Sequence, residues 1–204
     1  MFDLIVIILQ FISGSIMFSY ILARSLGVDL SKIRDGNPGS TNLWRAKGIK
    51  WGIIALLLDY FKGTFPLFLF LNLKLINNKY TICIAALAGI AGHAFSPMLK
   101  FKGGKAVATT FGAWSVLTTW QGPIILGGVF TLFSIFKRKT TVEDDAIRVL
   151  IGFLALIPFV MYMSFSARYD LLIFYIGNLA IISYKHWTNW RNFFQRNITR
   201  CKFL

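Results

Sequence analysis

Two glycine-containing polar stretches carry residue types that suit anion binding. The first, residues 35–45, reads DGNPGSTNLWR, and the second, residues 102–105, reads KGGK. Glycine lets backbone N–H groups approach an anion closely, and Asn and Thr add neutral donors. Arginine adds a planar, permanently charged group that matches phosphate oxygens. Most glycine loops are only turns, so a turn and a phosphate site are both open interpretations of these stretches.

Three further polar residues adjoin expected helices. The KGGK stretch opens a helical segment, and a helix N-terminus favours anions through its free N–H groups and dipole. The spacing of a nucleotide-binding P-loop is absent. His93 precedes this stretch, while His186 and Asn189 are three residues apart and would share one face of a helix. Each of them could equally be a packed or interfacial residue.

Asp59 and Lys62 form a charged pair inside an otherwise apolar segment. Residues three apart share a helical face, and charges at membrane depth normally face the interior of the helix bundle or an aqueous cavity. The pair can be an internal ion pair that orients the helix. Alternatively, it supports a site near the cytosolic end of that helix.

Apolar segments must position these residues. The chain has 204 residues, of which 56% are hydrophobic, more than a soluble domain of this length requires. Residues 4–23 carry no charge and can cross about 30 Å of hydrocarbon at about 1.5 Å per residue. This segment lacks the basic start and the cleavage site of a signal peptide, so we predict a retained span. Further apolar segments are predicted at residues 51–73, 80–99, 106–120, 121–136, 149–167 and 171–184.

These segments predict an all-α integral membrane protein with about seven transmembrane helices. Residues 106–136 can form two short spans or a re-entrant hairpin, and both alternatives leave an odd number of crossings. We see no linker or internal repeat, so residues 1–204 are predicted to form one domain. Cys83 and Cys201 have no spacing typical of a disulfide framework or a metal site.

The basic residues predict the orientation. Eighteen of the 22 Lys and Arg residues fall on one side, in loops 24–50, 100–105 and 137–148 and in the tail from residue 185. The positive-inside rule therefore places the C-terminus in the cytosol and the N-terminus outside. The same basic residues are also expected to attract anionic lipid headgroups. No recognition module in the sequence indicates nucleic-acid binding.

At this point six motifs, in order along nearly the whole chain, resemble one family. They are Gly14-Ser15-Ile16, Gly36-Asn37-x-Gly39-x-Thr41-Asn42-x-x-Arg45, Leu58-Asp59-x-x-Lys62-Gly63, Gly92-His93-x-Phe95, Phe101-Lys102-Gly103-Gly104-Lys105-x-Val107-Ala108-Thr109 and His186-x-x-Asn189. The chain resembles the bacterial acyl-phosphate:glycerol-3-phosphate acyltransferases of membrane phospholipid synthesis. The Phe-Lys-Gly-Gly-Lys block is the most specific of these motifs.

The resemblance implies a multi-pass enzyme of the bacterial inner (plasma) membrane with its active site facing the cytosol. It implies transfer of an acyl group from acyl phosphate to the 1-hydroxyl of glycerol 3-phosphate, which gives lysophosphatidic acid and phosphate. It implies no cofactor and no metal. An upstream enzyme that forms acyl phosphate is a possible partner, together with the membrane lipids.

The resemblance also implies roles for residues, carried over by matched position. Arg45 and Lys105 are the expected catalytic residues, and with His186 and Asn189 they are expected to hold glycerol 3-phosphate. The acyl-phosphate head is expected to contact Asn37, Gly39, Thr41, Asn42, Gly103 and Gly104. His93 and Lys102 complete the set of expected substrate-binding residues.

Several departures from the family pattern, among them Trp187 and Thr188 where Arg and Glu are common, leave the reaction rate and the exact substrates open. Asp35 stands where the family usually has Ser, and it would repel phosphate unless it pairs with Arg34 or Arg45. Met17 replaces Pro, Ala106 replaces Gly, and the third loop carries Glu143, Asp144 and Asp145 in place of the usual pattern. The alternatives are a diverged paralogue with altered or lost activity and a transporter of phosphorylated metabolites. Inverted repeats, which would favour the transporter, are not found.

Overall fold

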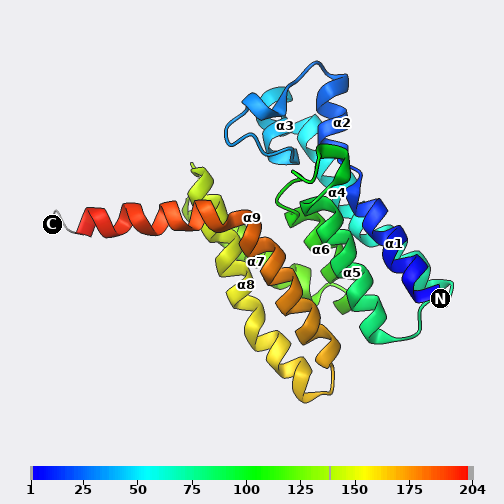
Figure 1. Ribbon diagram of the computed structural model, residues 1–204. Helices are drawn as coiled ribbons and strands as arrows, with labels where there is room; N and C mark the ends of the chain where they lie inside the picture. Colours follow the sequence, from blue (N-terminus) through cyan, green and yellow to red (C-terminus); the bar gives the residue numbers. More distant parts are fainter. Residues whose placement is uncertain (1, 138, 202–204) are drawn as a thin grey trace.

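The computed structural model describes residues 2–137 and 139–201. Within these residues every regular element is helical (Figure 1). The α-helices are α1 (Phe2–Ser15), α2 (Phe18–Ser25), α3 (Ser40–Lys47), α4 (Ile49–Asn72), α5 (Lys79–Ala94), α6 (Val107–Thr118), α7 (Gln121–Phe136), α8 (Val142–Phe165) and α9 (Tyr169–Cys201). Two 3-10 helices, η1 (Leu30–Lys32) and η2 (Pro97–Leu99), lie in the connections. The prediction of an all-α protein is confirmed.

Four segments of the described chain are long and apolar enough to cross a membrane: Asp3–Ser25, Ile49–Asn72, Lys79–Leu99 and Val142–Phe165. Helices α6 and α7 are apolar but shorter, at 12 and 16 residues. They are joined by Thr119 and Trp120, whose φ angles of 58° and 120° reverse the chain between them. The number of seven crossings and the choice between short spans and a re-entrant hairpin stay predictions.

The first apolar segment is not one continuous helix, as residues 4–23 were expected to be. Helix α1 ends at Ser15 and α2 begins at Phe18. The interruption leaves the carbonyl of Ile16 available, and it accepts a hydrogen bond of 2.5 Å from Nζ of Lys62. Lys62 also forms an ion pair of 2.9 Å with Asp59, so the expected pair exists and is anchored to the break.

The third loop was expected at residues 137–148, but α8 already begins at Val142. Thr141 and Asp144 form a reciprocal capping box, in which each side chain accepts from the other residue's backbone N–H. Acidic residues are stabilised at the start of a helix by its dipole. The acidic run 143–145 therefore belongs to the first turn of α8. Hydropathy alone excluded it from the span because it is charged.

Helix α9 also exceeds its predicted range of 171–184, since it continues to Cys201. Its last part turns away from the bundle in Figure 1. Trp190 ties it to α8 by donating from Nε1 to the carbonyl of Ala146 at 2.7 Å. The basic tail of the sequence is thus helical as far as the structure describes it.

The core is built by α1 packing on α5, α4 on α6, and α5 and α8 on α9. A polar contact holds its centre, where the indole N–H of Trp114 donates to Asn178 Oδ1 at 3.1 Å and Asn178 Nδ2 donates to Thr110 at 3.0 Å. Gly14 lies so close to α5 that a Cβ there would meet the carbonyl oxygen of Gly89 at 2.0 Å. This close packing supports the elements that form the pocket described next.

Candidate active site between the glycine loops and the starts of α6 and α8

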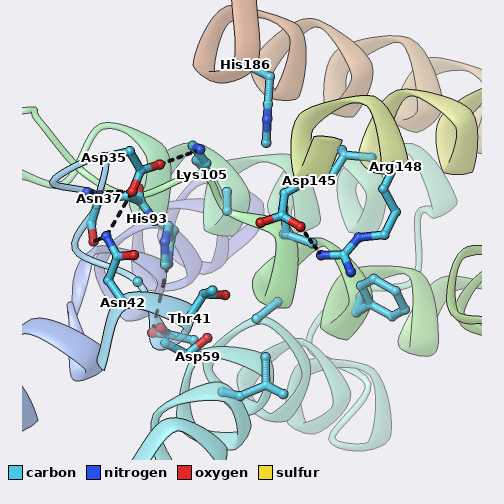
Figure 2. A pocket seen from close by; sticks show the side chains of 18 of the residues that line it. Asp35, Asn37, Thr41, Asn42, Asp59, His93, Lys105, Asp145, Arg148 and His186 are labelled. Atoms are coloured by element: carbon cyan, nitrogen blue, oxygen red, sulfur yellow. Dashed lines mark hydrogen bonds and ion pairs between the residues drawn. The ribbon is translucent and has the colours of Figure 1, made fainter. Parts of the chain in front are cut away.

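A cavity of about 380 Å³ lies among the loop before α3, the start of α6, the start of α8 and α9 (Figure 2). Seven of the predicted site residues line it: Asn37, Gly39, Thr41, Asn42, His93, Lys105 and His186. They come from four segments far apart in the sequence. The fold therefore brings most of the expected residues into one place.

Five predicted site residues do not line this cavity: Arg45, Lys102, Gly103, Gly104 and Asn189. Arg45 and Lys102 are exposed, and Asn189 is half-buried. Of the two expected catalytic residues, Lys105 lines the cavity and Arg45 does not. The role of Arg45 stays a prediction that rests on the family resemblance.

Asp35 pairs with Lys105, a third cation beside the two arginines, Arg34 and Arg45, that were considered as its partners. Nζ of Lys105 lies 2.7 Å from Oδ2, and both side chains are about one-fifth exposed. Oδ1 of Asp35 accepts from Asn42 Nδ2 at 2.9 Å and from the backbone N–H of Asn37 at 3.3 Å. Partial burial would raise the pKa of Asp35. The hydrogen bonds and the charge of Lys105 outweigh that effect and hold its pKa below the ordinary value.

Asn42 organises the loop in addition to lining the cavity. Its Nδ2 also donates to the carbonyls of Ile33 and Asn37, at 3.0 Å each. The side chain is buried, so these contacts satisfy an amide that would otherwise be costly to bury. Through these hydrogen bonds Asn42 holds the loop 33–39 in shape, and its predicted contact with substrate stays a prediction.

Gly103 and Gly104 pack against His93. A Cβ on Gly103 would meet the carbonyl oxygen of His93 at 2.0 Å, and a Cβ on Gly104 would meet its Nε2 at 2.3 Å. The N–H of Gly104 donates to that carbonyl at 3.1 Å, and Lys185 donates to the carbonyl of Gly103 at 2.9 Å. The two glycines are needed because the loop lies directly on a histidine, and this contact positions Lys105.

His93 connects the cavity to the buried ion pair. Its Nδ1 lies 3.3 Å from Thr109 Oγ1 and 3.9 Å from Asp59 Oδ1. The other carboxylate oxygen of Asp59 accepts from Ser19 at 2.6 Å. Of the two interpretations of Asp59 and Lys62, an internal ion pair and support for a site, the geometry combines both.

His186 is buried, with 2% of its surface exposed. Neither ring nitrogen has a hydrogen-bond partner among the described residues. The ring stacks on Trp190 with centroids 5.9 Å apart, and it points into the cavity from α9 (Figure 2). A buried polar ring without partners is costly unless a ligand or water satisfies it, so His186 is a candidate contact for substrate.

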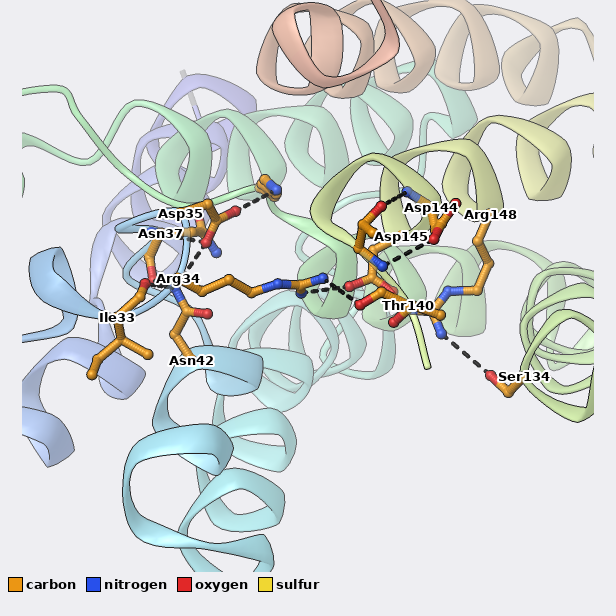
Figure 3. A network of polar contacts seen from close by, with 12 residues as sticks. Ile33, Arg34, Asp35, Asn37, Asn42, Ser134, Thr140, Asp144, Asp145 and Arg148 are labelled. Atoms are coloured by element: carbon orange, nitrogen blue, oxygen red, sulfur yellow. Dashed lines mark hydrogen bonds and ion pairs between the residues drawn. The ribbon is translucent and has the colours of Figure 1, made fainter. Parts of the chain in front are cut away.

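Three charged residues that line the cavity were missed as site residues: Arg34, Asp145 and Arg148. Asp145 accepts from Arg34 Nη1 at 2.6 Å and lies 3.3 Å from Nη2 of Arg148 (Figure 3). The i, i+3 spacing of Asp145 and Arg148 was the available signal, but it required the third loop to be helical. The long-range partner Arg34 carries no local signal in the sequence.

The cavity has an apolar wall beside these polar groups, formed by Leu56, Ala106, Val107, Ala108, Phe111, Phe130 and Val149. One site therefore offers both cations and a hydrocarbon-like surface. Together with the apolar helices, this defines a membrane-embedded helical protein whose site suits a molecule with an anionic head and an apolar chain.

Comparison with known proteins agrees with that class. A family model described as glycerol-3-phosphate acyltransferase matches residues 4–196. Glycerol-3-phosphate acyltransferase 1 of Thermotoga maritima is 56% identical over 192 residues, which cover 91% of this chain and 95% of that protein. The glycerol-3-phosphate acyltransferase of Endomicrobium trichonymphae is 32% identical over 201 residues, covering 97% of this chain and 95% of that protein.

Two solved structures share the fold. Crystal structures of PlsY (YgiH), an integral membrane glycerol 3-phosphate acyltransferase, match this chain with TM-scores of 0.73 for the glycerol 3-phosphate form and 0.71 for the lysophosphatidic acid form. Each is 30% identical to this chain, and each match covers 97% of this chain and 92% of the PlsY chain. This chain belongs to the glycerol-3-phosphate acyltransferase family and is a multi-pass membrane protein, which confirms the resemblance found in its motifs.

Proposed function

We propose that this chain transfers an acyl group from acyl phosphate to the 1-hydroxyl of glycerol 3-phosphate. The products are lysophosphatidic acid and inorganic phosphate, and the reaction serves bacterial phospholipid synthesis. The observation that carries the proposal is the composition of one cavity, where Lys105 and His186 lie beside an apolar wall that includes Phe111 and Phe130. The PlsY structures, in their glycerol 3-phosphate and lysophosphatidic acid forms, support the same acceptor and product.

The chemistry needs orientation and charge stabilisation more than a strong base, because acyl phosphate is already activated. The oxygen of the 1-hydroxyl attacks the acyl carbonyl carbon, and the bond from that carbon to the phosphate oxygen breaks. The hydroxyl proton passes to a substrate phosphate oxygen. In this proposal Lys105 stabilises the negative charge that grows on the leaving phosphate, while Asn37, Gly39 and Thr41 contact the acyl-phosphate head.

The roles proposed for the other predicted site residues depend on whether each residue lines the cavity. His93 and Asn42 line it and are proposed to support the substrate-binding loops. Gly103 and Gly104 are proposed to act by fixing Lys105 through their contact with His93. Arg45, Lys102 and Asn189 are proposed as substrate contacts on the resemblance alone.

The proposed setting is the bacterial inner membrane, with seven crossings, the N-terminus outside and the C-terminus in the cytosol. The site would then face the cytosol, where an enzyme that forms acyl phosphate could supply the donor. In support, the loop before α3, the start of α8 and the turn of α9 lie toward the same end of the bundle (Figure 1). The basic loops predicted to be cytosolic lie toward this end.

The test is phosphate release by the purified protein in detergent or a lipidic mesophase, with palmitoyl phosphate as donor. Release is expected to depend on glycerol 3-phosphate, and Lys105→Met is expected to reduce it by about 10²–10³-fold, as for loss of a group that stabilises transition-state charge. Lys47→Met is the matched control, because Lys47 is exposed on α3 and does not line the cavity.

The outcomes separate the alternatives. Equal rates for Lys105→Met and Lys47→Met in folded protein would contradict the role of Lys105. Binding of glycerol 3-phosphate without turnover would indicate a diverged paralogue, and its movement across a vesicle membrane would indicate a transporter.

A further inference from the structure

The last part of α9 presents an apolar stripe that the described chain leaves uncovered. The stripe consists of Trp187, Phe194 and Ile198, which are 64%, 49% and 59% exposed. Because these residues are seven and four positions apart, they lie on one face of the helix. An exposed stripe of large apolar side chains marks contact with a membrane or with another protein.

The opposite face of the same helix is polar. Thr188, Asn192 and Arg196 follow one another at intervals of four residues, and all three are exposed. Arg191 is also exposed and lies at the border between this polar face and the apolar stripe. A helix with aromatic residues on one face and polar and basic residues on the other is typical of helices that lie in the plane of a membrane surface.

The charge of this segment favours an anionic surface over a second copy of the chain. From residue 186 to the end of the sequence, four basic residues occur and no acidic one: Arg191, Arg196, Arg200 and Lys202. Arg196 pairs with Glu143 at 3.4 Å, whereas Arg191 pairs with no carboxylate of the described chain. A second copy would bring the same positive charge to the contact and would be repelled. Anionic lipid headgroups complement it.

The length of α9 places this segment at the level of a membrane surface. The helix has 33 residues and is therefore about 50 Å long, more than the roughly 30 Å of hydrocarbon in a bilayer. It packs along α5 and α8, which both belong to segments long enough to cross a membrane. Its last part leaves the bundle near the start of α8 (Figure 1). The end of α9 thus extends beyond the length needed to cross the hydrocarbon.

Two contacts with the start of α8 hold the segment in place without using the stripe. Trp190 donates from Nε1 to the carbonyl of Ala146 at 2.7 Å, and Arg196 lies 3.4 Å from Glu143. These contacts order the helix before it meets a lipid surface, so less conformational entropy is lost on binding. The stripe and Arg191 remain available.

We propose that α9 from Trp187 onward is an interfacial helix that binds the surface of an anionic bilayer. Trp187, Phe194 and Ile198 enter the boundary between the headgroups and the acyl chains, about 5–10 Å deep. Arg191 contacts the phosphates of anionic headgroups, for which a guanidinium is well suited. The proposal concerns how the chain sits on the membrane and does not depend on the proposed function.

The experiment measures the depth of nitroxide labels in the purified full-length protein, in lipid nanodiscs of phosphatidylglycerol and of phosphatidylcholine. The labels are attached one at a time, in a Cys201→Ser background, since Cys83 is buried and does not react. The label positions are Phe194→Cys and Ile198→Cys on the stripe, and Thr188→Cys and Asn192→Cys on the polar face. In phosphatidylglycerol, the stripe labels are expected to collide with oxygen dissolved in the lipid, and the polar-face labels with a nickel chelate dissolved in water.

The contribution of charge is tested with Arg191→Gln. In phosphatidylglycerol, this variant is expected to lower the ratio of immersed to water-exposed label at residue 194 about 5-fold, as for the loss of one basic residue near an anionic surface. In phosphatidylcholine it is expected to change nothing. Lys47→Gln is the matched control, because Lys47 is exposed on α3 and belongs to a different helix, so neither lipid should show an effect.

Three results would overturn the proposal, each in protein with the wild-type melting temperature. Equal access of the nickel chelate to all four labels would mean that the helix lies in water. Protection of the stripe labels from both reagents would mean that a protein, such as a second copy, covers the stripe. Equal depth in both lipids, unaffected by Arg191→Gln, would mean that anionic lipid is not the partner. If Phe194→Cys does not fold, Ile198→Cys and Asn192→Cys make the same comparison.

Discussion

The protein has one ion pair in its interior and two in the cavity, and the interior and cavity pairs differ in how far they are buried. The interior cluster joins Asp59 and Lys62, whose side chains are only 2% and 1% exposed. The cluster in the cavity joins Asp35 to Lys105 and Asp145 to Arg34, with side chains 18% to 20% exposed. Burial makes the interior pair a fixed structural feature, because neither charge can return to water at low cost. The same chemistry in the cavity remains exchangeable.

The interior pair supports the second cluster. Lys62 fixes the break between α1 and α2 through the carbonyl of Ile16, and Asp59 approaches His93. His93 in turn packs against Gly104 and accepts a backbone hydrogen bond from it, and Gly104 directly precedes Lys105. The ion pair in the interior thus supports the loop that positions Lys105.

The largest effect on stability is expected from Lys62→Met. It leaves Asp59 charged in the interior without its partner, which costs about 3–5 kcal/mol. The measurement is the thermal or denaturant stability of the protein in detergent, compared with Lys47→Met, which removes an exposed lysine. Equal stability of the two variants would show that the interior pair is not the fixed feature that this comparison requires.

A smaller effect is expected from Gly104→Ala, which tests the link between the clusters. The added methyl would lie 2.3 Å from Nε2 of His93, and overpacking of this kind costs about 1–3 kcal/mol. Activity is expected to fall with stability, because Lys105 moves with the loop. Gly128→Ala on α7 is the control, since a Cβ there meets nothing within 4 Å. A Gly104→Ala variant with wild-type activity and stability would break the proposed link.

The pair in the cavity is expected to show a modest dependence on pH. The pKa of Asp35 lies below its ordinary value of 3.8 in the folded protein. Its contribution to stability is therefore complete above the ordinary pKa and is lost as the pH falls through the lowered one. The stability difference between wild type and Asp35→Asn is expected to be constant from pH 7 to about 5, to begin to shrink as the pH approaches 3.8, and to vanish only below the lowered pKa. A difference that changes between pH 7 and 6 would contradict this assignment.

The smallest effect is expected from Arg196→Gln. Arg196 is 67% exposed where it pairs with Glu143, and surface pairs contribute about 0–1 kcal/mol. Stability and turnover of the variant are expected to stay within error of wild type. A large loss would mean that exposure is a poor guide to the function of ion pairs in this protein.

The sequence predicted the apolar helices well because hydropathy reports burial in lipid directly. It failed where specific hydrogen bonds override average composition. The break at residues 16 and 17 depends on Lys62, 45 residues or more away, and the helical start of α8 depends on the capping box of Thr141 and Asp144. Hydropathy averaged over a window of residues contains no information on either contact.

The candidate site was predictable in part. Motifs identified Lys105, Asn37, Thr41 and His186, all of which line the cavity. Arg34 was missed because its partner Asp145 is distant in sequence, and Arg148 was missed because its i, i+3 relation to Asp145 required residues 142–148 to be helical. No signal in the sequence indicated the partner of Asp35, since Lys105 is close in space and distant in sequence.

The most direct test of the account is the fate of the 1-hydroxyl oxygen of glycerol 3-phosphate labelled with ¹⁸O. The account predicts one lysophosphatidic acid for each phosphate released from palmitoyl phosphate, with the label retained in the ester and none in the phosphate. Label in the released phosphate, or phosphate formed without lysophosphatidic acid, would contradict acyl transfer at this site.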